Sequence, residues 1–245
     1  AGCICANACM RSGSGLVTLA VENEIFPIVA SKMSEVMVLD IDSYKGDFEN
    51  LVKTCDVIAI GPGLGIRDFS KEKLQYILDN STSPVIIDAD GLNVLAENIN
   101  FLNTRKNLST IVLTPHLGEF ARLCNCNIAD VIKNKDILAV EFAKRYKNII
   151  LVLKSDTTII TDGEDSFICD EGVPQMATGG MGDALCGMIT SFVGQSIPIL
   201  DSCLLAVFTH SYIARKLSNN MNSVLAQDII EEIPYILANF RKIKD

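Results

Sequence analysis

This chain of 245 residues is short of basic side chains, with 21 lysine and arginine residues against 30 acidic ones and a net charge of −9. Nucleic acids and anionic membranes bind basic surfaces, so we expect neither as a partner. No apolar run approaches the roughly 20 residues of a membrane-spanning helix. No secretory leader is visible, and we expect a cytoplasmic protein.

The chain also lacks the paired C-x-x-C spacing of a zinc site, although it contains nine cysteines. Cys3 and Cys5 lie in a stretch that reads as a helix. Residues two apart in a helix point about 200° away from each other, so these two thiols cannot both face one metal ion. Cys124 and Cys126 are spaced C-x-C. We expect reduced thiols that pack in the core of a cytosolic protein.

No Pro/Gly/Ser linker, repeat or low-complexity tract divides the chain, and apolar residues make up 49% of it. Short β-branched runs alternate with amphipathic stretches, which predicts a mostly parallel sheet covered by helices on both faces. We therefore expect one three-layer αβα domain. The predicted strands are 16–21, 36–41, 56–60, 85–88, 111–114 and 149–154. The predicted helices between them include 71–79, 91–97, 118–124 and 135–146.

The pattern changes after Thr157, where a hairpin is predicted with Asp162-Gly163 in its turn. The remainder is predicted to be helical: a helix after the glycines near 180, then 200–217 and 227–241.

Residues 177–184 read Ala-Thr-Gly-Gly-Met-Gly-Asp-Ala and precede an apolar run at helical spacing. Glycines allow a sharp turn and close approach to a ligand. Unpaired N–H groups and the positive dipole at a helix N-terminus suit a phosphate. Asp183 would lie in the first turn, where its carboxylate can take a proton from a hydroxyl beside that phosphate. The pattern suggests phosphoryl transfer, although a tight turn with Asp183 stabilising the helix start explains the stretch equally well by itself.

Two predicted strands run into turns that suit a ligand. Strand 56–60 leads into Gly61-Pro-Gly-Leu-Gly65, which lacks the glycine spacing of a dinucleotide fingerprint and also fits an ordinary strand-to-helix turn. Strand 85–88 leads into Asp88-Ala-Asp90, and two carboxylates there need a cation, a metal or N–H partners. Asp90 can act alone as a helix N-cap, or the stretch can contact a ligand or Mg²⁺.

Two further strands end in polar residues. After strand 111–114, Thr114 and Pro115 resemble an N-cap followed by proline at the first helical position. His116 and Glu119 would then face one crevice, although a histidine there is often structural. Strand 149–154 delivers Lys154-Ser-Asp-Thr-Thr158, which can hold nucleotide phosphates or form a solvated hairpin start. Because the carboxyl ends of parallel strands meet at one edge of a sheet, we expect these stretches to lie close together.

These motifs, in this order, resemble the ADP/ATP-dependent NAD(P)H-hydrate dehydratase family of the ribokinase-like superfamily. The Thr-Pro-His-x-Gly-Glu element separates that family from sugar and vitamin kinases of the same fold. The resemblance implies one ribokinase-like domain over 1–245 whose N-terminal strand is missing. The motifs that carry it are Met10-Arg-Ser-Gly-Ser-Gly-Leu-Val17, Ile60-Gly-Pro-Gly-Leu-Gly65, Ile87-Asp-Ala-Asp-Gly-Leu-Asn93, Leu113-Thr-Pro-His-Leu-Gly-Glu119, Val152-Leu-Lys-Ser-Asp-Thr-Thr158 and residues 177–184.

The resemblance also implies a role for each matching residue. Asp183 would be the catalytic base, and Glu119 would hold Mg²⁺ through water. The hydrated nicotinamide dinucleotide would contact Ala1, Gly61, Gly63, His116 and Asp183. The nucleotide, ADP or ATP, would contact Lys154, Ser155, Asp156, Thr157, Thr158, Gly179, Gly180 and Gly182.

The implied reaction is cofactor repair: phosphorylation of the ring hydroxyl of NAD(P)HX, followed by loss of phosphate to give NAD(P)H. We also expect a homo-oligomer. One alternative is a kinase of the same fold that acts on a vitamin-precursor alcohol. Another is a non-catalytic nucleotide-binding module, which Asp183 argues against, because a carboxylate beside bound phosphates only repels them.

Overall fold

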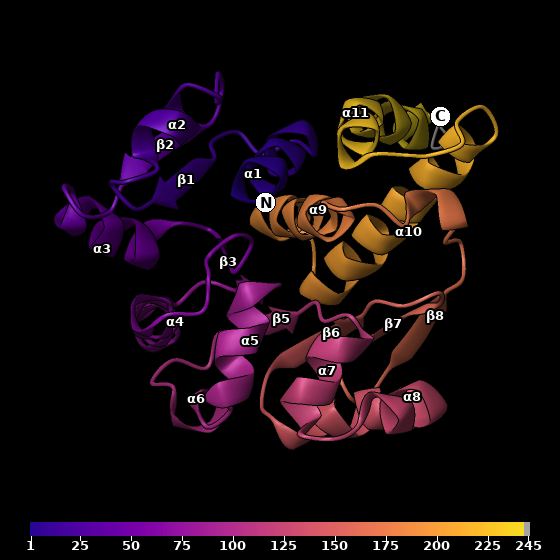
Figure 1. Cartoon of the computed structure of the whole chain (residues 1–245), viewed down its shortest axis with the longest axis horizontal. Helices are drawn as coiled ribbons and strands as arrows, with labels where there is room; N and C mark the ends of the chain where they lie inside the picture. The colour runs from indigo at the N-terminus through magenta and orange to yellow at the C-terminus, as the bar shows by residue number, and fades with distance from the viewer. Residues whose placement is uncertain (243–245) are drawn as a thin grey trace. The chain divides into compact units, whose positions relative to one another are not determined.

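The structure, a computed structural model, describes residues 1–242, with side chains described up to residue 240 (Figure 1). The chain forms two compact units. The first comprises Ala1–Cys55 together with the described residues from Glu171 onward, and the second is Asp56–Asp170.

A six-stranded sheet forms the centre of the second unit, in the order β3-β4-β5-β6-β7-β8. The first four strands run parallel and the last two are antiparallel. The strands β4, β5 and β6 are buried and consist only of valine, isoleucine and leucine, as expected for parallel strands with both faces covered. The bounds are β3 (Ile58–Ile60), β4 (Val85–Ile87), β5 (Ile111–Leu113), β6 (Ile149–Leu153), β7 (Thr158–Thr161) and β8 (Ser166–Cys169).

The register of these strands aligns their carboxyl ends. Ile60 lies opposite Ile87, which lies opposite Leu113 on its other side. The ladder continues one residue further, because Asp88 donates its N–H to the Ile60 carbonyl and Thr114 donates to Ile87. The residues that follow the four parallel strands therefore lie along one edge, as the sequence predicts.

The helices of the second unit follow the predicted pattern with longer bounds. They are α4 (Asp68–Asn80), α5 (Asp90–Glu97), α6 (Phe101–Thr104), α7 (Leu117–Cys124) and α8 (Ile128–Arg145). Figure 1 shows α5 beside α7, and the two helices are in contact.

Helix α8 contains a kink at Asn134, whose backbone angles (φ −129°, ψ 25°) are not helical. The Asn134 side-chain amide donates to the carbonyl of Asp130 at 3.2 Å, so a side-chain hydrogen bond enters the series of backbone hydrogen bonds along the helix. The predicted helix 135–146 corresponds to the part of α8 that follows this kink.

The late hairpin is confirmed, with β7 paired antiparallel to β8. Gly163 in its turn has φ +97°, a conformation that glycine adopts without strain.

In the first unit, β1 (Thr18–Val21) and β2 (Met37–Asp40) pair in parallel as a separate two-stranded sheet. The strands predicted at 16–21 and 36–41 therefore exist, but they do not extend the six-stranded sheet. The helices of this unit are α1 (Gly2–Arg11), α2 (Phe26–Ala30), α3 (Lys45–Thr54), the 3₁₀ helix η1 (Pro174–Met176), α9 (Met181–Gly194), α10 (Ile199–Ser218) and α11 (Ala226–Lys242).

Helices α1 and α9 pack closely because small residues line their contact. A β-carbon placed on Gly187 would lie 2.1 Å from the carbonyl oxygen of Cys5 and 2.8 Å from the β-carbon of Ala8. Ala8 and Ala184 belong to a buried cluster that also includes residues of α11. Glycine at 187 therefore sets the distance between the two helices.

Over residues 1–242, no helix has both the length and the apolar character needed to cross a bilayer. In the same described part of the chain, no cluster of three or more His, Cys, Asp or Glu side chains has the spacing to hold a metal ion.

Replacing Gly187 by alanine tests the packing of α1 on α9. Helix propensity alone would favour alanine by about 1 kcal/mol, but the added methyl group overlaps Cys5. We expect the free energy of unfolding to fall by about 1–3 kcal/mol, as in other overpacked cores. Urea denaturation measures this.

Gly46→Ala is the matched control, because nothing lies within 4 Å of an added β-carbon in that helical position. We expect that variant to equal or exceed the wild type. A Gly187→Ala variant as stable as Gly46→Ala would contradict the close packing.

Candidate active site

The glycine turn after β3 is shaped by a close backbone contact. Gly61 has φ +126°, and a β-carbon there would lie 1.7 Å from the carbonyl oxygen of Asp88. Gly63 and Gly65 also have positive φ, of 73° and 74°. Gly61 is thus required for the approach of the two strand ends, a structural role that does not depend on any ligand.

Asp90 ties this turn to the next strand end, and the predicted N-cap at Asp90 is wrong. The residue that caps α5 is Ala89, which has φ 48°, and Asp90 is the first helical residue. Its Oδ2 instead accepts a hydrogen bond from the backbone N–H of Gly65 at 2.8 Å. The Asp90 carboxylate therefore binds a turn 25 residues earlier in the chain and does not form the predicted N-cap hydrogen bond within its own helix.

A buried ion pair joins the ends of β4 and β6. Lys154 Nζ lies 2.7 Å from Asp88 Oδ1, and the Asp88 side chain is only 2% exposed. Lys154 also continues the sheet, because its N–H donates to the carbonyl of Pro115 and it forms a parallel bridge with His116. The cation that the sequence places at this strand end therefore neutralises one of the two carboxylates.

The N-terminus of α7 is capped by His116, so the predicted cap at Thr114 is also wrong. The bridge to Lys154 keeps the backbone extended through His116 (φ −80°, ψ 169°), and the helix begins only at Leu117. His116 Nδ1 accepts from the N–H groups of Gly118 and Glu119, while the His116 N–H donates to Glu119 Oε2. This is a reciprocal capping box.

The capping box fixes the histidine tautomer and half-exposes the ring. Because Nδ1 of His116 accepts two hydrogen bonds, the proton of the neutral imidazole is on Nε2. That nitrogen lies 3.5 Å from Glu119 Oε1. The His116 side chain is 57% exposed, so the capped ring is still open to a ligand.

Glu119 is buried, and burial raises the pKa of its carboxyl group above the ordinary value of 4.5. The hydrogen bond from His116 and the charge of Lys154 oppose that rise in pKa.

The stretch after β6 is held by a residue that no sequence motif predicts. Lys135, just past the kink in α8, donates from Nζ to Ser155, Asp156 and Thr157. Lysines are common on helix surfaces, and neither composition nor spacing distinguishes this one from its neighbours.

The remaining predicted residues lie in the first unit, around the start of α9. Gly180 has φ +92° and is the N-cap residue, and a β-carbon on it would lie 2.9 Å from Ile4 Cδ1. Asp183 is in the first turn, as predicted, with its side chain 15% exposed and its Oδ2 4.0 Å from the nitrogen of Ala1. The structure thus brings Ala1 and Asp183 together.

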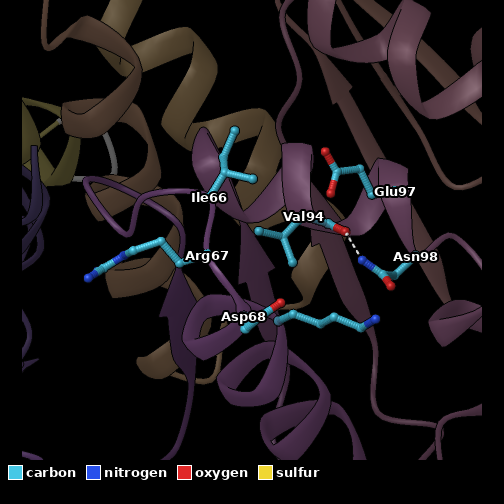
Figure 2. Close-up of a pocket in the computed structure, with 7 residues that line it drawn as sticks. Ile66, Arg67, Asp68, Val94, Glu97 and Asn98 are labelled. Atoms are coloured by element: carbon cyan, nitrogen blue, oxygen red, sulfur yellow. Dashed lines mark hydrogen bonds between the residues drawn. The ribbon is translucent and has the colours of Figure 1, made fainter.

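Two hollows lie beside the glycine turn, at Ile66, and Figure 2 shows the smaller one. The smaller, of about 140 Å³, is lined by residues at the start of α4 and the end of α5, among them Arg67, Val94 and Asn98. The larger, of about 450 Å³, extends toward Arg122, whose Nε donates to Asn93 Oδ1. Both hollows are lined by residues other than the predicted site residues.

The predicted residues therefore form two groups. In the second unit, Gly61 contacts the Asp88 backbone, Lys154 pairs with Asp88, and His116 is joined to both Lys154 and Glu119. In the first unit, the turn before α9 presents Asp183 beside Ala1.

Comparison with solved structures identifies the class of fold. A ribokinase-like superfamily protein from Enterococcus faecalis has a TM-score of 0.86 and 28% identity, covering 98% of this chain and 82% of that chain. The ribokinase-like α/β class predicted from the motifs is confirmed.

Comparison of sequences narrows this class to one family. The model of the NAD(P)H-hydrate dehydratase family matches residues 1–235. An ADP-dependent (S)-NAD(P)H-hydrate dehydratase from Listeria monocytogenes is 35% identical, over 98% of this chain and 83% of that protein. A bifunctional NAD(P)H-hydrate repair enzyme from Vibrio cholerae is 33% identical over 96% of this chain. That protein is longer, and the match covers 46% of its length. The chain belongs to the NAD(P)H-hydrate dehydratase family.

Replacing Lys154 by methionine tests the buried ion pair. The change leaves the Asp88 carboxylate buried without its cation, and we expect a loss of about 3–5 kcal/mol in the free energy of unfolding. Adding Asp88→Asn to this variant removes the uncompensated charge and should recover part of the loss. Urea denaturation of both variants measures this. A Lys154→Met variant as stable as the wild type would contradict the pairing.

Replacing Glu119 by glutamine tests the buried carboxyl group through pH. Because the pKa is raised in the folded state, folded Glu119 binds more protons than unfolded Glu119, and its contribution to stability is lost as pH rises. The loss begins near the ordinary value of 4.5 and ends above the raised pKa. Glutamine keeps the acceptor oxygen for His116 but does not titrate. We expect the stability difference between the variant and the wild type to grow in the variant's favour across that window. A difference independent of pH in denaturation experiments would contradict this.

Proposed function

We propose that this protein dehydrates the hydrated nicotinamide cofactor NAD(P)HX to NAD(P)H, with ADP or ATP as the phosphoryl donor. The observation that carries the proposal is the family match over residues 1–235. The named dehydratase from Listeria monocytogenes is described as ADP-dependent and supports a nucleotide co-substrate.

The chemistry explains why a nucleotide is needed. Water added across C5 and C6 of the nicotinamide ring leaves a hydroxyl at C6, and hydroxide is a poor leaving group. Transfer of the terminal phosphoryl group to that oxygen makes a good leaving group and releases AMP from ADP, or ADP from ATP. The lone pair of the ring nitrogen then expels phosphate, and loss of a proton from C5 restores the double bond.

Asp183 is the proposed base for the ring hydroxyl. Aspartate is a weak base, because the reference pKa of its carboxyl group is near 3.9. A weak base suffices when the transition state is loose and the proton leaves late. The helix N-terminus stabilises charge by only about 0.3–2 kcal/mol, whereas enzymes lower barriers by about 8–23 kcal/mol. Most of the rate must therefore come from alignment, for which about 7–11 kcal/mol is available.

Mg²⁺ is the proposed metal, and it would neutralise charge on the transferred phosphoryl group. Glu119 would hold one of its water ligands. Mg²⁺ keeps several waters and needs only one or two carboxylates besides the phosphates of its nucleotide. Glu119 supplies one such carboxylate, and the chemistry of its oxygens fits that requirement.

The remaining proposed contacts follow the family motifs. Ala1, Gly61, Gly63 and His116, with Asp183, would contact NAD(P)HX. The nucleotide would contact residues 154–158 and the glycines at 179, 180 and 182. We also propose a homo-oligomer, which light scattering on the purified protein tests.

The direct test is to incubate the protein with NAD(P)HX, Mg²⁺ and ADP or ATP. We expect reduced nicotinamide and inorganic phosphate to appear together, and both to require the nucleotide and the metal. Chelation of the metal should stop both signals, and fresh Mg²⁺ should restore them. A stable phosphate ester without reduced nicotinamide would instead indicate a small-molecule kinase of the same fold.

Asp183→Asn tests the proposed base. We expect turnover to be abolished while nucleotide binding, measured by calorimetry, changes little, because asparagine fills the same space but takes no proton. Asp47→Asn is the matched control, since Asp47 is an exposed aspartate in the first turn of α3. Turnover by Asp183→Asn at the rate of the control would rule out this role.

A further inference from the structure

Lys135 contacts all three residues of the stretch 155–157, and no sequence motif predicts these contacts. Its Nζ lies 3.1 Å from Ser155 Oγ, 3.0 Å from Asp156 Oδ1 and 2.6 Å from Thr157 Oγ1. An ammonium group has three N–H donors and no acceptor. Each donor of Lys135 is therefore used on one of three successive side chains.

The position of Lys135 is set by the fold of the second unit. It is the first residue after the kink at Asn134, and its side chain is 20% exposed. Asp156 by contrast is 85% exposed, and the hydrogen bond from Lys135 holds the pKa of its carboxyl group below the ordinary value of 3.8. Asp156, whose acidic charge is unexpected beside a nucleotide, is thus an anchor for Lys135.

The hydrogen-bond directions leave one proton of this stretch without an assigned acceptor. Ser155 donates its hydroxyl proton to the carbonyl of Thr157 at 2.5 Å and accepts from Lys135. Thr157 can only accept from Lys135, because the ammonium has no lone pair. Among the described residues, the Thr157 hydroxyl proton has no acceptor, so it is available to a ligand.

We propose that Lys135 is a positioning residue for the nucleotide: it fixes residues 155–157 and thereby directs the Thr157 hydroxyl proton toward an oxygen of the ADP or ATP. This inference rests on the proposed function only in taking residues 154–158 as the nucleotide-binding stretch. Lys135 itself does not contact the nucleotide, because its three donors are already used.

Calorimetric titration of the purified protein with ADP, without NAD(P)HX, tests this directly. Lys135→Met keeps the length of the side chain but loses its donors, so the Thr157 hydroxyl is no longer directed at the nucleotide. We expect the Kd for ADP to rise about tenfold, the usual effect of losing one hydrogen bond to a charged group. Lys133→Met is the matched control, because Lys133 is exposed on the same helix and carries the same charge. It should bind ADP like the wild type.

A double variant separates positioning from a general loss of structure. Thr157→Val removes the directed hydroxyl and should weaken ADP binding. Once that hydroxyl is gone, Lys135 has nothing left to direct. The further change Lys135→Met, made in Thr157→Val, should therefore raise the Kd for ADP by much less than tenfold. If the rise in Kd of the double variant equals the product of the two single rises, the inference is overturned. It is also overturned if Lys135→Met binds ADP as tightly as the control. Thermal unfolding of each variant identifies the folded samples.

The ADP-binding measurements test the role of Lys135 independently of the dehydration assay. If the wild type binds ADP and the variants behave as expected while no NAD(P)H forms, the proposed reaction fails and the role of Lys135 stands. If the wild type forms NAD(P)H with ADP and Lys135→Met binds ADP normally, only the role of Lys135 fails.

Discussion

The ion pair between Lys154 and Asp88 is the constraint on which the candidate residues of the second unit depend. Asp88 follows β4 and Lys154 follows β6, so the pair spans the end of β5 between them. The same lysine forms the bridge that keeps His116 extended. A buried carboxylate without that cation would be costly. The ion pair joins the ends of β4 and β6, and the bridge from Lys154 to His116 includes the residues that follow β5.

Each neighbouring turn is then fixed by a contact that reaches across the sheet edge. Gly61 allows the Asp88 carbonyl to approach, and Asp90 holds the N–H of Gly65. On the far side, Lys135 from α8 holds the stretch after Lys154. The edge is thus organised before any ligand binds, which lowers the entropy that binding must overcome. That is the property a reaction dependent on alignment requires.

The sequence predicts much of this fold because its local signals agree. The valine and isoleucine runs of β4 and β6, the Asp162-Gly163 turn and the glycines before α9 each favour one structure on their own. Contacts between distant residues escape such reasoning. Asp90 reads as a cap, yet its carboxylate binds Gly65, and the bridge from His116 to Lys154 moves the cap of α7 from Thr114 to His116. Lys135 carries no local signal at all, because its partners lie about 20 residues further along.

The proposed reaction requires that the ring hydroxyl of the hydrate is phosphorylated before it leaves. Heavy-oxygen label placed in that hydroxyl follows the bond that breaks. We expect the label to appear in the inorganic phosphate, because the C6–O bond is cleaved after phosphoryl transfer. Label recovered in water, with unlabelled phosphate formed alongside, would mean that the hydroxyl leaves directly and that nucleotide hydrolysis is a separate event.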